Sequence, residues 1–285
     1  LEKGVAVANA RTDMDIDLGR IYLSPFHHSP LVLYRAYKGE SDFPLRVEID
    51  SLFVGHRGHD TLVYVHALRL SAVARTTQVP ISGQDSTFVI PPIVVEQLRL
   101  ERTTFHSDSL IATVGVDVIV GGLDVSSPDV NIAQGRYPLH GLRLNDVDVG
   151  IDLRSSAPDT VPEDTTPLQL AFDLPDGELR NVHFRLTPVG LDIRTRSLST
   201  SALVDVGANK YDARRLHVGG FVLSIGEVRI PTDTIYGTAC ADIQHNLVTS
   251  PGLHVRSDEL GARADLSATE MNLGTMCVEA VGDAE

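Results

Sequence analysis

Strict alternation of apolar and polar residues is the feature that most constrains the fold of this chain. It is clearest at Met14, Ile16 and Leu18, at Leu45, Val47 and Ile49, and in 112–120, where every second residue is Ala or Val. Side chains of a β-strand point alternately to opposite faces, so this period of two describes strands with one apolar face. The pattern predicts a mainly β protein built as an elongated antiparallel sheet of repeating hairpins, with few or no helices.

The alternation changes phase at several places. In Tyr137–Leu153 the apolar residues Leu142 and Leu144 are followed by two residues, Asn145 and Asp146, before Val147 resumes the pattern. A hairpin with a two-residue loop would keep all apolar side chains on one face, and Asn-Asp suits the turn it needs. We therefore predict a hairpin here and at Gly219-Gly220, whose residues suit the same turns.

The same jump occurs at Ser71-Ala72 and Glu101-Arg102, where the residues suit a tight turn poorly. A β-bulge also shifts the phase by one residue, and we predict bulges at these two places.

A short motif, apolar–Arg/His–apolar, recurs along the chain at loose intervals. Its copies end at Leu70, Leu100, Leu144, Phe184, Val218 and Val255. The spacing fits repeated strand-and-hairpin units better than a solenoid of fixed period. The central Arg and His residues exchange between copies, which indicates an outward polar position.

Two further segments concern domain organisation. Ser29–Gly39 has the signals of a short helix over residues 29–38, with Ser29 as N-cap, Pro30 in the first turn and Gly39 at the end, although the same residues could lie extended. Segment 155–167 is rich in Pro, Ser, Thr and Asp and is expected to be a loop. It separates a first β segment, 1–154, from a second, 168–285, which we expect to continue the same sheet.

Composition excludes some classes of partner. The formal net charge is −14, which disfavours binding to nucleic acid and to anionic lipid through a basic patch. No apolar run is long enough to cross a bilayer as a helix. Because the chain starts at Leu1 without Met or a signal peptide, we expect any membrane anchor to lie outside it. Cys240 and Cys277 could form a disulfide or remain as two thiols.

No pattern of catalytic residues or metal ligands stands out. The pairs His27/His28 and His56/His59 lack a third ligand at a defined spacing, and the alternating aspartates lack the residues of a calcium loop. Nucleotide-binding and hydrolase motifs are missing as well. We expect no enzyme activity, no cofactor and no metal.

The repeat units resemble the AsmA-like family, and more closely its TamB branch of the Bacteroides type. The residues that carry the resemblance are LRVEIDSLFV and DTLVYVHALRL in 45–70, FVIPPIVVEQLRLERTTF in 88–105, GRYPLHGLRLNDVDVGIDL in 135–153 and ELRNVHFRLTP in 178–188.

The resemblance implies a fold and a location. It implies a β-taco, an open β-groove with an apolar interior, in a periplasmic protein anchored in the inner membrane by an N-terminal helix. It also implies transport of phospholipid toward the outer membrane, and a partner, an outer-membrane barrel assembly protein, bound through regions outside this segment. We expect a monomer.

The alternation and the scarcity of aromatic residues also suit an apolar groove that binds acyl chains. The residues expected to line it are Leu98, Leu100, Leu142, Leu144, Val182, Phe184, Leu216 and Val218. Two alternatives stay open: a closed β-sandwich serving as an adhesin or carbohydrate-binding cell-surface module, and a scaffold that assembles outer-membrane proteins by β-augmentation.

Overall fold

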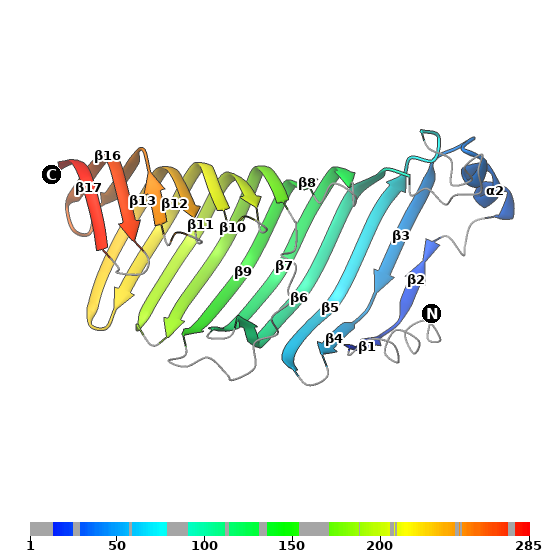
Figure 1. Ribbon diagram of the computed structural model, residues 1–285, viewed down its shortest axis with the longest axis horizontal. Helices are drawn as coiled ribbons and strands as arrows, with labels where there is room; N and C mark the ends of the chain where they lie inside the picture. The colour runs from blue at the N-terminus through cyan, green and yellow to red at the C-terminus, as the bar shows by residue number, and fades with distance from the viewer. Residues whose placement is uncertain are drawn as a thin grey trace.

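The structure of the chain is a computed structural model dominated by one long β-sheet (Figure 1). It describes residues 14–24, 29–56, 59–78, 91–111, 114–130, 136–153, 171–187, 189–205, 208, 210–242, 245, 247–272 and 277–285. These residues form a single 17-stranded sheet and one α-helix. The prediction of a mainly β, elongated sheet is confirmed.

The strands are long in the middle of the sheet and short or interrupted near its ends. Their bounds are β1 Met14–Leu18, β2 Ile21–Leu23, β3 Phe43–Ile49, β4 Leu52–His56, β5 His59–Ala74, β6 Ile93–Ile111, β7 Val114–Val130, β8 Arg136–Pro138, β9 His140–Leu153, β10 Ala171–Thr187, β11 Leu191–Asp205, β12 Lys210–Ile225, β13 Val228–Asp242, β14 Leu247–Ser250, β15 Leu253–Ser257, β16 Ala262–Asn272 and β17 Cys277–Ala284; the helix α2 spans Pro30–Lys38.

In the middle of the sheet, strands that follow one another in the sequence pair with one another; near the ends the pairing skips a strand or more, as between β1 and β4, β3 and β5, and β13 and β15. From β5 to β7 and from β10 to β13 each strand pairs antiparallel with the next. The exception lies in the middle, where β10 pairs in parallel with β8 and β9. Because β9 and β10 pair directly, the sheet continues across residues 154–170, and the predicted loop 155–167 lies outside the described residues.

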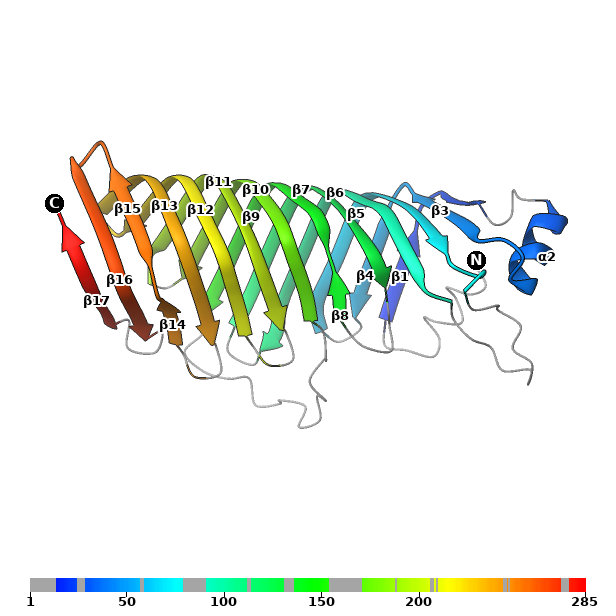
Figure 2. The same cartoon turned by 90° about the horizontal axis from the view of Figure 1, so that it is seen from above.

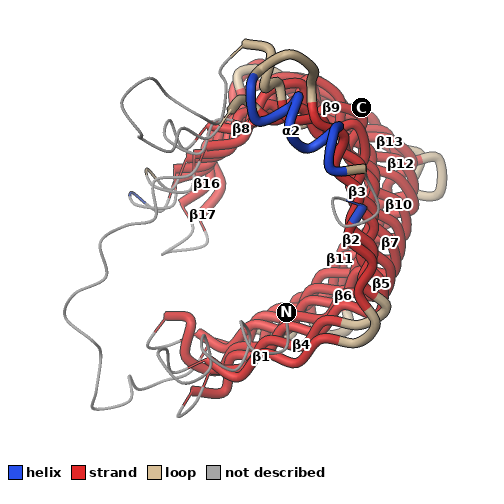
Figure 3. The backbone as a smooth tube through the Cα atoms, turned by 90° about the vertical axis from the view of Figure 1, so that its right-hand side faces the viewer, coloured by secondary structure: helices blue, strands red, loops and turns tan. Residues whose placement is uncertain are grey.

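The sheet is bent around its long axis. Viewed along that axis, the strands trace an open C (Figure 3), and from above they form two walls (Figure 2). All described strands belong to the one sheet, so it has a concave and a convex face but is not a sandwich of two sheets in the part described. Helix α2 lies at the N-terminal end of the long axis, beyond β3 (Figure 1).

A line of irregular residues, which we call the first bend line, crosses the long strands at one level. Register pairing skips one residue in each strand there: Val65 pairs with Thr103 and Ala67 with Glu101, while His66 and Arg102 are passed over. Four of the skipped residues have positive φ, between 46° and 64°. The line comprises His66, Arg102, Gly121, Asp146, Asn181, Arg196, Gly220 and Asp233.

The first bend line explains the phase jumps in the sequence. Asp146 has φ 53° within β9, and Gly220 has φ 64° within β12, so each strand turns its face without ending. The predicted hairpins at Asn145-Asp146 and Gly219-Gly220 are therefore wrong. The pairs Leu142/Leu144 and Val147/Val149 lie on one strand, and the left-handed residue keeps both pairs on the same face.

Arg102 shows the same geometry. Both β5 and β6 skip one residue at this level, so the register is unchanged, whereas a β-bulge would add a residue to one strand only. The predicted bulge at Glu101-Arg102 is thus a bend with φ 46° at Arg102.

A second bend line is made of true register shifts nearer the other ends of the strands. A register shift does fall at Ser71 and Ala72, but the extra residue is Glu96 of β6, since Ser71 pairs with Gln97 and Ala72 with Val95. The bulge predicted within Ser71-Ala72 thus lies in the neighbouring strand. Further shifts lie between Leu174 and Gly177 in β10 and between Ser201 and Ala202 in β11. The two lines divide each long strand into straight pieces, and this division shapes the C.

Helix α2 forms where the sequence signals predicted it. Ser29 is the N-cap with extended φ and ψ, Pro30 opens the first turn, and Gly39 ends the helix at φ 76°. Glycine adopts this left-handed conformation without the steric cost that a Cβ would add, and its N–H group donates to the carbonyl of Ala36. No described helix is long and apolar enough to span a membrane.

Candidate functional site

One apolar row follows the sheet from end to end, and we call it the aliphatic row. Each of its members pairs in register with the next across neighbouring strands, and paired residues share a face of the sheet. Nothing polar interrupts the row between β3 and β15. Its members are Ile49, Leu68, Leu100, Leu123, Leu144, Leu179, Leu198, Val218, Ile235 and Val255.

The eight predicted lining residues all lie on the face of the aliphatic row. Leu100, Leu144 and Val218 belong to the row itself. Leu98, Leu142 and Leu216 lie two residues further along their strands, towards the second bend line. Val182 and Phe184 lie beyond the first bend line, where Val182 pairs with Val147 and Phe184 with Val149.

The repeat alignment that ended one copy at Phe184 is wrong. Leu179, not Phe184, is the register partner of Leu144, and Leu198 is the next member of the row. The same two-residue jump, from Leu179 to Val182 across Arg180 and Asn181, was present in the sequence and marks Leu179 as the equivalent position. Leu198 was harder to find in the sequence, because the residue across the first bend line from it, Thr195, is polar where the other strands mostly have an apolar residue.

Burial places the aliphatic row on the concave face. Val218 is 6% exposed, whereas its neighbour His217 on the same strand is exposed. Inside a curved sheet neighbouring side chains crowd together, and outside it they spread apart. The other nine members of the row are half-buried, because no second sheet or helix among the described elements covers them. The concave face is thus apolar along this row and partly open to solvent.

Polar side chains occupy the convex face, as the Arg/His exchange predicted. Next to the aliphatic row runs Arg69, Arg99, Asp124, Arg143, Glu178, Ser199, His217, Tyr236 and His254, each in register with the next. Ion pairs join some of these strands, such as Arg99 with Asp124 at 3.0 Å. Exposed pairs of this kind contribute little stability, so this row chiefly solvates the outside of the sheet.

His183 joins three strands on the convex face beyond the first bend line. Its Nε2 lies 2.8 Å from Asp192 Oδ2 and its Nδ1 lies 3.1 Å from Asp148 Oδ2. The hydrogen bond from His183, opposed by burial and helped by Arg194, lowers the pKa of Asp192. Burial also opposes ionisation of Asp148, but hydrogen bonds from Arg185 and His183 outweigh it and lower its pKa. Both carboxylates therefore stay ionised near neutral pH.

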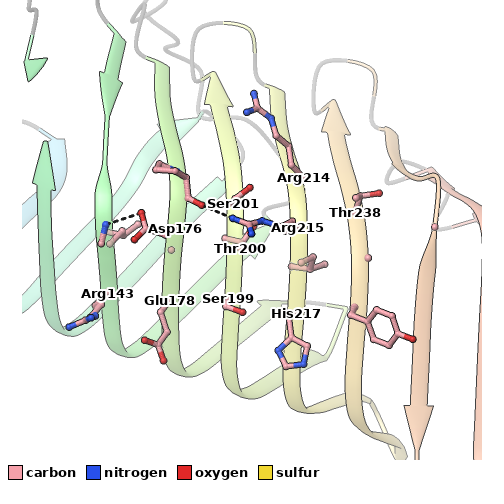
Figure 4. Close-up of a pocket in the computed structure, with 18 of the residues that line it drawn as sticks. Arg143, Asp176, Glu178, Ser199, Thr200, Ser201, Arg214, Arg215, His217 and Thr238 are labelled. Atoms are coloured by element: carbon pink, nitrogen blue, oxygen red, sulfur yellow. Dashed lines mark hydrogen bonds between the residues drawn. The ribbon is translucent and has the colours of Figure 1, made fainter. Parts of the chain in front are cut away.

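A hollow of about 760 Å³ lies along the second bend line (Figure 4). Its lining includes Arg143, Glu178 and His217 from the polar row and also Leu142 and Leu216, two of the predicted groove residues, so residues of both faces meet where the register shifts. Asp176 accepts a hydrogen bond from the Gly141 amide, and Arg215 donates to the Pro175 carbonyl. The first bond joins the neighbouring strands β9 and β10, and the second reaches from β12 across β11 to β10.

No group of three or more His, Cys, Asp or Glu residues in the described part of the chain could hold a metal ion. His27 and His28 lie outside the described residues, and His56 and His59 are register partners where β4 meets β5. Cys240 is a free thiol.

Comparison of the chain with family models, with curated proteins and with solved structures gave no match.

Proposed function

We propose that this chain is a groove segment of a TamB/AsmA-like protein, which binds phospholipid acyl chains along its concave face and conducts them between the inner and outer membranes. The observation that carries the proposal is the uninterrupted aliphatic row on an open concave face. A binding pocket for one small molecule would need a closed end, whereas this row has the same chemistry from β3 to β15.

The dimensions of the row suit a sliding hydrocarbon chain. Neighbouring strands are about 4.8 Å apart, so the nine intervals from Ile49 to Val255 extend over roughly 40 Å. Every position along this length offers Leu, Ile or Val, so an acyl chain meets no polar barrier as it moves. Removing one CH₂ from water is worth ~0.8 kcal/mol, which gives roughly 13 kcal/mol as an upper limit for a sixteen-carbon chain.

The proposal includes the location and partner that the family resemblance implies. The segment would lie in the periplasm, anchored in the inner membrane through residues outside it, and an outer-membrane barrel assembly protein would bind the same full-length protein elsewhere. Charged and polar residues on the convex face suit an aqueous compartment, and the headgroup of a bound lipid would remain in water at the opening of the C.

The experiment that tests the proposal is native mass spectrometry of the full chain purified from a Gram-negative periplasm. We expect copurified phospholipid, and we expect Leu198→Asp to lose most of it because the carboxylate would lie in the middle of the aliphatic row. Ser199→Asp is the matched control, since it adds the same charge one residue away on the convex face.

Two results would count against a lipid-binding groove. A folded, lipid-free wild-type chain would favour a structural or adhesive role for the sheet. Equal lipid loss in Leu198→Asp and Ser199→Asp would show that the concave face has no special part in binding. Crosslinks from the edge strand β17 to unfolded outer-membrane strands, without lipid, would favour the β-augmentation scaffold instead.

A further inference from the structure

Helix α2 has an apolar outer surface. Leu31 is 57% exposed, Tyr34 56% and Tyr37 47%, and the three are spaced i, i+3, i+6 along the helix. Residues at this spacing share one side of an α-helix. The outward side of a helix packed on a soluble protein is normally polar, so this stripe marks a surface suited to an interaction.

The opposite side of α2 attaches it to the sheet. Ala36 is 2% exposed and Val32, four residues earlier, is half-buried, which places both on the inward side. The helix contacts β3 and lies beyond the strands at one extremity of the long axis (Figures 1 and 3). The apolar stripe therefore faces away from the body of the molecule at one end of the concave face.

Basic side chains flank the stripe. Arg35 and Lys38 occupy the last turn, and α2 contains no acidic residue. The Lys38 ammonium lies 5.9 Å from the Tyr34 ring centre. Neither basic residue forms an ion pair within the described part of the chain. In a chain of formal net charge −14, a helix with two cations and no anion is unusual; the first acidic residue after it is the exposed Glu40.

We propose that α2 is a membrane-contact element whose Leu31–Tyr34–Tyr37 stripe inserts into the headgroup region of a phospholipid bilayer. Tyrosine places its ring in the apolar zone and its hydroxyl in water, and Arg and Lys extend to the lipid phosphates. The proposal goes beyond acyl-chain binding because it assigns a second surface, and it places one end of the concave face against a lipid surface.

A bilayer fits this stripe better than a protein partner does. A nine-residue helix is about 13 Å long, so one side of it offers far less than the ~800 Å² per partner of a stable protein interface. A bilayer needs no such area from a single element, since contact by a short amphipathic helix is reversible and depends on insertion together with headgroup charge.

A fluorescence experiment tests the contact directly. The chain contains no tryptophan, so Tyr34→Trp introduces a single reporter at the centre of the stripe. We expect its emission to shift to shorter wavelength when phosphatidylcholine vesicles containing some phosphatidylglycerol are added to the full chain. Tyr236→Trp is the control, because Tyr236 is exposed to the same extent as Tyr37 but lies on the convex face; its emission should not change.

Vesicle flotation with two further variants separates the contributions. Leu31→Ser/Tyr37→Ser should abolish flotation, and Arg35→Gln/Lys38→Gln should weaken it about fivefold per charge, in vesicles with phosphatidylglycerol only. Circular dichroism checks that the variants fold, as expected for exposed positions.

The membrane contact would be overturned if the emission of Tyr34→Trp did not shift on adding vesicles, or if that of Tyr236→Trp shifted equally. It would also be overturned if the Tyr34→Trp emission shifted without vesicles when only the protein concentration was raised, because that shift would report contact with a second copy of the chain. Leu198→Asp should leave flotation unchanged, so failure of acyl-chain binding and failure of the α2 contact are distinguishable.

Discussion

Gly220 offers the sharpest test of the first bend line. Gly220 has φ 64°, so an alanine at this position would have to adopt the left-handed conformation. Its Cβ would lie 3.2 Å from Arg196 Cβ in the neighbouring strand. The conformation alone costs an L-residue about 1–2 kcal/mol. Part of that cost is offset because Ala lowers the conformational entropy of the unfolded chain, which stabilises the folded state by about 0.4–1 kcal/mol. The crowding adds about 1 kcal/mol, so we expect Gly220→Ala to lower the free energy of unfolding by about 2 kcal/mol.

Gly226→Ala is the matched control. Gly226 has φ 58° in the turn between β12 and β13, and a Cβ there would meet nothing within 4 Å. Gly226→Ala therefore has the conformational cost without the crowding, and we expect a loss of only about 1 kcal/mol. The difference between the two variants isolates the close approach of strands at the bend.

Hydrogen exchange of the amides in β11, β12 and β13 is the suitable measurement, because a long sheet whose strands contact only their neighbours can open locally. If Gly220→Ala and Gly226→Ala cost the same, the strands do not approach closely at the first bend line. If Gly220→Ala costs nothing, Gly220 does not adopt the left-handed conformation.

Two further predictions concern pH. Hydrogen bonds from the Thr77 side chain, then from Arg75 and the Thr77 amide, lower the pKa of Asp42 from 3.8 to about 2. The ionised Asp42 carboxylate therefore stabilises the fold above pH about 3.8, and this contribution is lost as pH falls towards 2. The Thr77 amide donates to Asp42 Oδ1, so its protection from exchange should decrease over that range, and Asp42→Ala, which removes the acceptor, should lose it already at neutral pH; unchanged protection in Asp42→Ala would contradict this. His183→Ala should raise the pKa of Asp192, because the largest stabilising hydrogen bond to that carboxylate disappears; titration by NMR of the carboxylate carbon measures the shift, and an unaltered pKa would contradict the bridge.

The sequence predicted the strands and the helix because their signals are local. Alternation reports which face a strand buries, and Pro30 and Gly39 mark the ends of α2 in any context. The phase jump was also visible, but its cause was not. A hairpin and a left-handed residue within one strand give the same pattern, and only the pairing of Asn145 with both Gly122 and Arg180 distinguishes them.

The lining residues were placed on the correct side of the sheet because the alternation fixes the face. Which of them belong to the aliphatic row could not be predicted from the alternation, because the register between strands depends on residues far apart in the sequence. Phe184 has the motif of a repeat copy but pairs with Val149. The parallel pairing of β9 with β10 was unexpected for the same reason. The apolar outer side of α2 required the packing of Ala36 and Val32 to be known first.

The first bend line has a consequence for how such a molecule can vary in size. Since each strand turns at the same level as its neighbours, a duplicated hairpin could enter the sheet and extend it without altering its cross-section. The reach of the protein and the width of its interior are therefore independent variables. Selection could adjust the first by adding or deleting strand pairs, while the second stays set by where each strand places its left-handed or glycine residue.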